Sequence, residues 1–197
     1  MKKGALFLDR DGVINAPPPP GIRYILDPDA FYLMPGIAET IRLCNHHHIP
    51  VVVITNQKCV ALGRLSLEGL SAIHQRMTAL LGAEQAQIDG VYFCPHAEED
   101  ACDCRKPLPG MLLQAAREHQ IDLSLSWMVG DQPRDILAGR AAGCRTLHIG
   151  MPPSPDAESS LPDTRQLPQW LHMQIHENQA CGTDATDFPK PKSLHFH

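Results

Sequence analysis

The sequence predicts an α/β fold: a doubly wound, Rossmann-like parallel sheet with helices on both faces. Short apolar runs of strand length alternate along the chain with longer segments of helical periodicity. The clearest run, residues 51–54, is β-branched throughout, as expected of a strand covered on both faces. A chain of 197 residues is also long enough to bury one core. We therefore expect a single domain over residues 1–177.

Each strand is predicted from an apolar run, and each helix from a stripe of apolar residues or a capping residue. The expected strands are residues 5–8, 51–54, 90–93, 127–129 and 146–149. The expected helices are residues 35–46, 66–81, 109–120, 133–142 and 168–177. In the second helix Ser66 is the predicted N-cap. The predicted apolar stripe consists of Leu70, Ile73, Met77 and Leu80.

The remaining segments are expected to be loops or tail. Four prolines and a glycine at residues 17–21 predict an extended surface loop. Residues 151–167 are rich in Pro, Ser and Asp and are also predicted as loop, whereas residues 178–197 are expected to form a mobile tail. No large insertion follows the first or second strand, so we expect no cap domain.

Composition excludes several classes of function. The net charge of -5 argues against nucleic acid and anionic membranes as partners, because both usually require basic patches. No segment reaches the roughly 18 apolar residues of a membrane span, and the first apolar run is too short for a signal peptide. We therefore expect a cytoplasmic protein whose seven cysteines are thiols or metal ligands.

Clusters of polar side chains follow four of the predicted strands. They are Asp9 with Asp11, Thr55 with Asn56, Arg105 with Lys106, and Asp131. Ligands of open parallel sheets bind outside the carboxyl ends of the strands, so we expect the clusters to converge on one edge. These residue types suit phosphoryl transfer, because a carboxylate can attack phosphorus when Mg²⁺, held by further carboxylates, offsets the repulsion. Cationic side chains and Thr55 would then bind the phosphoryl oxygens.

Residues 7–15, Phe-Leu-Asp-Arg-Asp-Gly-Val-Ile-Asn, resemble the first motif of the haloacid dehalogenase-like phosphatases. Three further motifs match in order, at Thr55, at Lys106, and at Gly130-Asp131 with Asp135. The resemblance spans residues 4–150. It implies that Asp9 is the nucleophile and Asp11 the general acid/base, with Mg²⁺ held by Asp9, the Asp11 carbonyl and Asp131. Asp135 either supports this site or only stabilises the start of its helix.

A second motif consists of three thiols and one imidazole within eleven residues: Cys94, His96, Cys102 and Cys104. This set suits a closed, tetrahedral and therefore structural zinc site, which would rigidify the loop that carries Arg105 and Lys106. The alternative is a group of ordinary reduced cysteines. The motif resembles the zinc loop shared by D-glycero-D-manno-heptose 1,7-bisphosphate phosphatases and histidinol-phosphate phosphatases.

Two runs, residues 55–57 and 106–111, look more like the heptose branch. The resemblance implies a small sugar phosphate as substrate, with the C7 phosphate of a heptose bisphosphate preferred and Asn56, Gln57 and Arg105 among its contacts. Histidinol phosphate and a non-catalytic binding role stay open. Two departures from the usual heptose-type motifs bear on this choice. Lys58-Cys59 stands where Ser-Gly usually follows Thr-Asn-Gln, and Gln132 stands where a lysine usually follows the fourth-motif aspartate. Lys58 would supply the charge that is lost at Gln132.

We expect the partner to be a small phosphorylated metabolite and the chain to be a monomer. The three histidines at residues 46–48 could suggest a metal tract, but imidazoles that end a helix are more often exposed to solvent.

Overall fold

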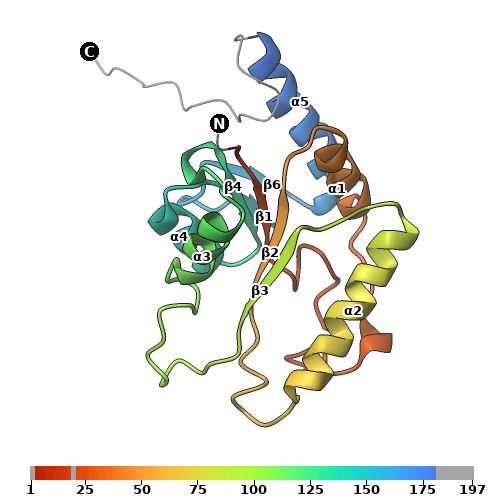
Figure 1. The fold of residues 1–197 in the computed structure, drawn as a ribbon, viewed down its shortest axis with the longest axis vertical. Coiled ribbons are helices and arrows are strands. Elements are labelled where there is room, and N and C mark those ends of the chain that lie inside the picture. Colours follow the sequence, from red (N-terminus) through yellow and green to blue (C-terminus); the bar gives the residue numbers. More distant parts are fainter. Residues whose placement is uncertain (1–2, 19–20, 181–197) are drawn as a thin grey trace.

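The computed structural model describes residues 3–18 and 21–180 as three layers, with a six-stranded sheet between two layers of helices (Figure 1). Every pair of neighbouring strands is parallel, and the strand order is β3-β2-β1-β4-β5-β6. The strands are β1 (Leu6–Leu8), β2 (Val51–Asn56), β3 (Gly90–Cys94), β4 (Trp127–Gly130), β5 (Arg145–Ile149) and β6 (Ser159–Leu161). This architecture confirms the predicted fold class.

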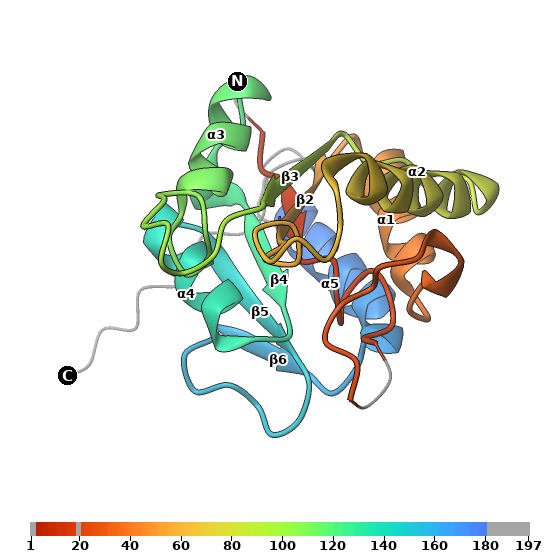
Figure 2. The same ribbon diagram turned by 90° about the horizontal axis from the view of Figure 1, so that it is seen from below.

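The helices divide between the two faces of the sheet, as Figure 2 shows. One face carries α1 (Ile37–His46), α2 (Leu67–Ala83) and α5 (Leu167–Ala180), and the other carries α3 (Gly110–Glu118) and α4 (Pro133–Ala142). Three short 3-10 helices, η1 (Pro28–Ala30), η2 (Leu123–Leu125) and η3 (Thr164–Gln166), lie in the connections.

The central strands are buried on both faces because successive side chains of a strand point in opposite directions. Leu6 and Leu8 pack in the cluster that includes α1, α2 and α5, whereas Phe7 packs in the cluster that includes α3 and α4. Val51 and Val53 alternate with Val52 in the same way. This double burial explains why the strand sequences are apolar without alternation.

The local signals for α2 are confirmed. Ser66 is its N-cap and accepts a hydrogen bond of 3.1 Å from the backbone N–H of Gly69. Of the predicted stripe, Leu70, Ile73 and Met77 are buried, whereas Leu80 is only partly buried and Leu81 is the fourth buried residue.

The prediction for residues 151–167 is wrong in part, because β6 extends the sheet there and η3 follows. Leu147 of β5 pairs with Ser159, and the Glu158 N–H donates to the Thr146 hydroxyl over 3.2 Å. A three-residue edge strand containing two serines lacks the apolar run by which longer strands are detected. At the other end α5 continues to Ala180, past the expected boundary at residue 177. Residues 19–20 of the Pro-rich loop and 181–197 of the expected tail lie outside the described residues.

The loops that follow β1, β2 and β3 gather at the lower end of the sheet in Figure 1. This is where the predicted site residues are found. Within residues 3–18 and 21–180, no helix has both the length and the apolar character needed to cross a membrane.

Candidate active site

Asp9 and Lys106 form the centre of the site. The backbone N–H of Asp9 donates to the Val129 carbonyl over 2.9 Å, which fixes the residue at the end of β1. The Lys106 ammonium is buried and donates to Asp9 Oδ1 and to the Ile54 carbonyl, each over 2.8 Å. It also forms an ion pair with Asp135 Oδ1 at 2.7 Å. Two carboxylates therefore share one buried cation.

Burial and charge set the protonation of this group. Burial, followed by the charge of Asp135, raises the pKa of Asp9 to about 7. Burial alone would lower the pKa of Lys106, but the charges of Asp135 and Asp9 outweigh it and raise that pKa. Lys106 therefore stays protonated at neutral pH and offsets one of the two carboxylates beside it.

Asp131 completes an acidic cluster with Asp9 and Asp135, in which one oxygen from each residue lies within 4.8 Å of the others. Asp131 Oδ2 accepts from Gln132 Nε2 over 2.8 Å, whereas Oδ1 is buried and has no hydrogen-bond partner among the described residues. A buried carboxylate oxygen without a partner is costly in free energy. The set of hard oxygen donors fits Mg²⁺, which would supply that partner.

The first-motif loop packs directly against Asp131. Gly12 has a φ of +95°, and a Cβ placed on it would lie 2.4 Å from Asp131 Oδ2, so only glycine is accommodated. Backbone hydrogen bonds from Asn15 to the Arg10 carbonyl (3.0 Å) and from Gly12 to the Asn15 carbonyl (2.9 Å) close the loop. The loop backbone next to Asp11 is thus near the carboxylates that could hold a cation.

Asp11 lies in a separate network of donors. Its carboxylate accepts from the Arg10 guanidinium at 2.8 and 2.9 Å, and from Asn15 Nδ2 and Gln57 Nε2 at 3.0 Å each. Burial acts to raise the pKa of Asp11, but the charge and hydrogen bonds of the buried Arg10 outweigh it and lower the pKa. Asp11 is therefore ionised in this state, the form that can accept a proton from water.

Asn56 and Gln57, which the resemblance implies as substrate contacts, have protein partners in the structure. Gln57 is buried, and its Nε2 donates to Asp11 and, over 2.9 Å, to Thr55 Oγ1. Asn56 exchanges two hydrogen bonds of 3.0 Å with the Lys106 backbone. Both amides hold other predicted site residues in place, a role that the motif alone did not indicate.

Asp135 makes contacts that fit both of the roles considered for it. One carboxylate oxygen accepts from the backbone N–H of Gln132 over 3.0 Å and caps α4, and the other pairs with Lys106. A Cβ on Gly130 would lie 2.1 Å from the Asp135 Cβ, so the glycine allows this close approach.

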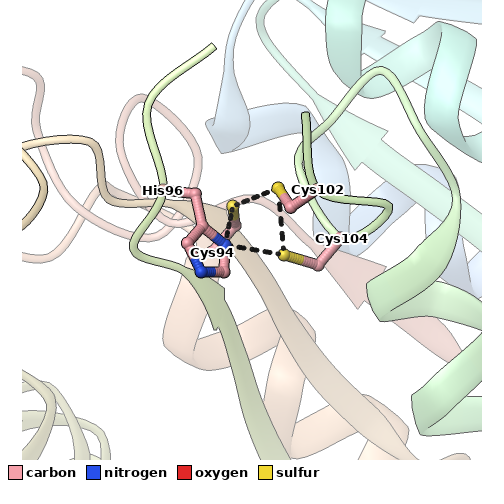
Figure 3. A group of neighbouring side chains, drawn as sticks. All are labelled: Cys94, His96, Cys102 and Cys104. Carbon is pink, nitrogen blue, oxygen red and sulfur yellow. Dashed lines mark hydrogen bonds between the residues drawn. The ribbon is translucent and has the colours of Figure 1, made fainter. Parts of the chain in front are cut away.

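The Cys/His cluster, defined as Cys94, His96, Cys102 and Cys104, forms a compact set in which the four donor atoms face one another (Figure 3). Cys102 Sγ lies 3.6 Å from Cys94 Sγ and 3.4 Å from Cys104 Sγ, and His96 Nδ1 lies 3.3 Å from Cys104 Sγ. Zinc–sulfur bonds of about 2.3 Å in a tetrahedron place sulfurs roughly 3.8 Å apart. The cluster therefore has nearly the dimensions that zinc requires, and its thiols are free.

A basic cavity of about 520 Å³ lies beside Asn56. It is lined by Arg23, Tyr24, Asn56, Lys58, Leu62, Glu98, Arg105 and Arg134. Glu98 pairs with Arg105 at 2.8 Å and with Lys58 at 3.4 Å, so Lys58 has a carboxylate partner here. Sequence reasoning missed Arg23 and Arg134, although Arg134 stands two residues after the Gln132 departure.

Comparison with known proteins identifies the same family that the sequence motifs resemble. A family model described as HAD-hydrolase-like matches residues 103–151. The D-glycero-β-D-manno-heptose-1,7-bisphosphate 7-phosphatase of Pseudomonas aeruginosa is 39% identical over 149 residues, covering 76% of this chain and 82% of that protein. Its counterpart in Escherichia coli K12 is 34% identical, covering 86% of this chain and 94% of that protein.

Solved structures agree with this grouping. The D,D-heptose 1,7-bisphosphate phosphatase of B. bronchiseptica, complexed with magnesium and phosphate, superposes with a TM-score of 0.77 at 31% identity, covering 86% of this chain and 98% of that chain. A β-phosphoglucomutase from Clostridium difficile, at 13% identity and a TM-score of 0.60, shares the fold. The chain therefore belongs to the HAD-like hydrolases, as a relative of the heptose-bisphosphate phosphatases, and is a phosphoric monoester hydrolase.

Proposed function

We propose that this protein removes the C7 phosphate of D-glycero-D-manno-heptose 1,7-bisphosphate in a Mg²⁺-dependent reaction that passes through a phosphoaspartate on Asp9. The observation that carries the proposal is the buried Asp9 carboxylate, held by Lys106 within 4.8 Å of Asp131 at the end of the sheet. The names of the relatives supply the substrate, and the cavity described above supports it.

In this proposal Asp9 attacks phosphorus while Lys106 and Thr55 bind the phosphoryl oxygens. Asp11, held by Arg10 and Gln57, must first take up a proton, which it then gives to the leaving oxygen. The carboxylate that remains accepts a proton from the water that attacks the phosphoaspartate. Mg²⁺ would be bound by Asp9, Asp131 and the Asp11 carbonyl, and its charge would offset that of the phosphoryl group.

The basic cavity favours a bisphosphate over histidinol phosphate. Four cationic side chains, Arg23, Lys58, Arg105 and Arg134, line it with the single carboxylate of Glu98. A second phosphate would be attracted to this lining, whereas the ammonium group of histidinol phosphate would be repelled. A non-catalytic role finds no support in the central group, because Asp9, Lys106 and Asp131 are all present and close together.

We also assign a structural zinc ion to the Cys/His cluster, because its four donors match a closed tetrahedral site. Such thiolates must stay reduced, which favours the cytoplasm as the location. Lys106 stands two residues after Cys104, so the zinc would fix the start of the segment that delivers the buried cation.

The test is phosphate release, in Mg²⁺, from heptose 1,7-bisphosphate and from histidinol phosphate, with ³¹P NMR to identify which phosphate leaves. We expect loss of the C7 phosphate and at least about a hundredfold preference in kcat/KM for the bisphosphate, which corresponds to roughly 2.7 kcal/mol. Arg134→Ala and Arg105→Ala should raise KM for the bisphosphate, whereas Arg117→Ala on α3 should not. Equal or better turnover of histidinol phosphate would contradict the substrate assignment.

A further inference from the structure

Arg10 connects Asp11 to a side chain that the proposed mechanism leaves without a role, His74 of α2. The Arg10 side chain is fully buried, and its Nη2 donates to the two carboxylate oxygens of Asp11 over 2.9 and 2.8 Å. Its other terminal nitrogen, Nη1, lies 3.4 Å from His74 Nε2. A guanidinium has only donors, so this histidine nitrogen is the acceptor and the ring is neutral.

The packing of α2 holds His74 in place. Its helix neighbours Ile73 and Met77 are buried in the core, which sets the rotation of the helix. The ring of Phe93 on β3 lies 5.7 Å from the His74 ring between centroids, at an interplanar angle of 56°. Burial, followed by the charge of Arg10, lowers the pKa of His74 to about 4, so the neutral acceptor persists at neutral pH.

We propose that His74 is a positioning residue that, through Arg10, holds the Asp11 carboxylate in the orientation in which it accepts a proton from water. The inference deepens the proposed function and rests on it, because that water hydrolyses the phosphoaspartate on Asp9. A buried guanidinium nitrogen without an acceptor is costly in free energy, so Arg10 would turn toward water once the imidazole is removed. The Asp11 carboxylate would then lose the fixed direction on which proton transfer depends.

The expected effect is moderate, because Asp11 has two further partners. Asn15 Nδ2 and Gln57 Nε2 each donate to it over 3.0 Å, and both bonds would remain in a variant of His74. General acid–base catalysis contributes about 10²–10⁴-fold, so loss of orientation without loss of the carboxylate should slow hydrolysis of the phosphoaspartate about tenfold. Formation of the phosphoaspartate should change little when the leaving group needs no proton.

The test separates the two steps in the full chain, with Mg²⁺ and zinc supplied, by using p-nitrophenyl phosphate, whose leaving group departs without a proton. The value of kcat/KM reports formation of the phosphoaspartate. Its lifetime is measured by labelling the protein with ³²P, adding excess unlabelled substrate and quenching in acid. His74→Leu should lengthen the lifetime about tenfold and change kcat/KM by less than about twofold. His74→Gln, whose amide oxygen can accept from Arg10, should restore the lifetime to within about threefold.

Two further variants calibrate the measurement. His119→Leu is the matched control, because the His119 ring also packs against an aromatic ring, that of Tyr92, with centroids 6.1 Å apart. It should change neither the lifetime nor kcat/KM. Asp11→Asn removes the proton acceptor itself and should lengthen the lifetime about a hundredfold or more.

The outcomes distinguish this inference from the proposed function. An unchanged lifetime in His74→Leu, beside a long one in Asp11→Asn, would overturn the role of His74 alone. A packing defect would slow both steps in His74→Leu and would not be relieved by His74→Gln, and that result would also overturn it. An unchanged lifetime in Asp11→Asn, or the absence of labelled protein in every variant, would instead contradict the proposed function and the inference with it.

Discussion

The short segment from Cys104 to Lys106 connects the Cys/His cluster to the acidic cluster, yet the fold holds the two clusters in different ways. Asp9, Asp131 and Asp135 are placed by strand ends and by the first turn of α4, and the buried ammonium of Lys106 offsets their mutual repulsion. The Cys/His cluster joins the end of β3 to a loop outside the helices and strands. The sheet thus preassembles the acidic cluster, whereas the Cys/His cluster would depend on the proposed zinc ion for rigidity.

The largest effect is expected from Asp9→Asn. An amide cannot attack phosphorus, so kcat should fall on the order of 10⁴-fold or more, as for other nucleophile substitutions. The Tm should change little, because the amide keeps the shape of the carboxylate. Phosphate release and thermal melting check this, with Asp156→Asn, an exposed carboxylate, as the matched control. Retention of activity would exclude Asp9 as the nucleophile.

Lys106→Met tests the claim that one cation holds the acidic cluster together. Its removal leaves two buried carboxylates without their counterion, which should lower the free energy of unfolding by about 3–5 kcal/mol and kcat by about 10²–10³-fold. Adding Asp135→Asn should restore part of the stability but not the activity. Chemical denaturation measures the first effect, and Lys3→Met, at an exposed lysine, is the surface control. An unchanged stability in Lys106→Met would contradict the account.

The double variant Cys102→Ser/Cys104→Ser tests the Cys/His cluster. It should lose about one equivalent of zinc, lower the Tm and reduce kcat/KM by about 10–100-fold, because the Arg105 segment loosens. Activity should not vanish, since Asn56 still holds the Lys106 backbone from β2. Zinc analysis, melting and kinetics are compared with Cys144→Ala, which lies outside the cluster. Full stability without zinc would count against a structural ion.

The smallest effect concerns pH. The pKa of Asp9 is raised from 3.8 to about 7, so the stability that its protonated form contributes is present at low pH and is lost as pH rises through about 7. Mg²⁺ binds the ionised form, so its affinity should rise by up to about tenfold per pH unit below 7 and then level off. Calorimetry from pH 5 to 8.5 measures this. A slope that persists unchanged in Asp9→Asn would show that another group is responsible.

Much of the fold, all four residues of the Cys/His cluster, and Asp9 and Asp131 of the acidic cluster could be predicted from the sequence, because long apolar runs, capping residues and fixed motif spacings are local signals. For Asp135 the sequence left two roles open. The edge strand β6 could not be predicted, since three residues with two serines carry no apolar pattern. Gln57 was also beyond such reasoning. Its position beside Thr55 suggests a substrate contact, but burial turns its amide toward Asp11, and burial depends on contacts distant in the sequence.

The cationic side chains of the basic cavity also depend on contacts between residues that are distant in the sequence. Lys58 was expected to replace the charge lost at Gln132, yet it pairs with Glu98, forty residues away in the sequence. Arg134 comes to the cavity from the first turn of α4 and Arg23 from the loop after β1, and neither belongs to a recognised motif. Motif spacing therefore located the catalytic centre, while the surroundings that select a substrate required the folded chain.

The most direct test of the central claim is to trap the phosphorylated protein. Single-turnover reactions with heptose 1,7-bisphosphate carrying ³²P at C7 would be quenched in acid, digested and mapped. We predict one labelled peptide that contains Asp9, whose label is released by hydroxylamine and is absent in Asp9→Asn. Turnover without a labelled protein, or label on a different residue, would contradict the account.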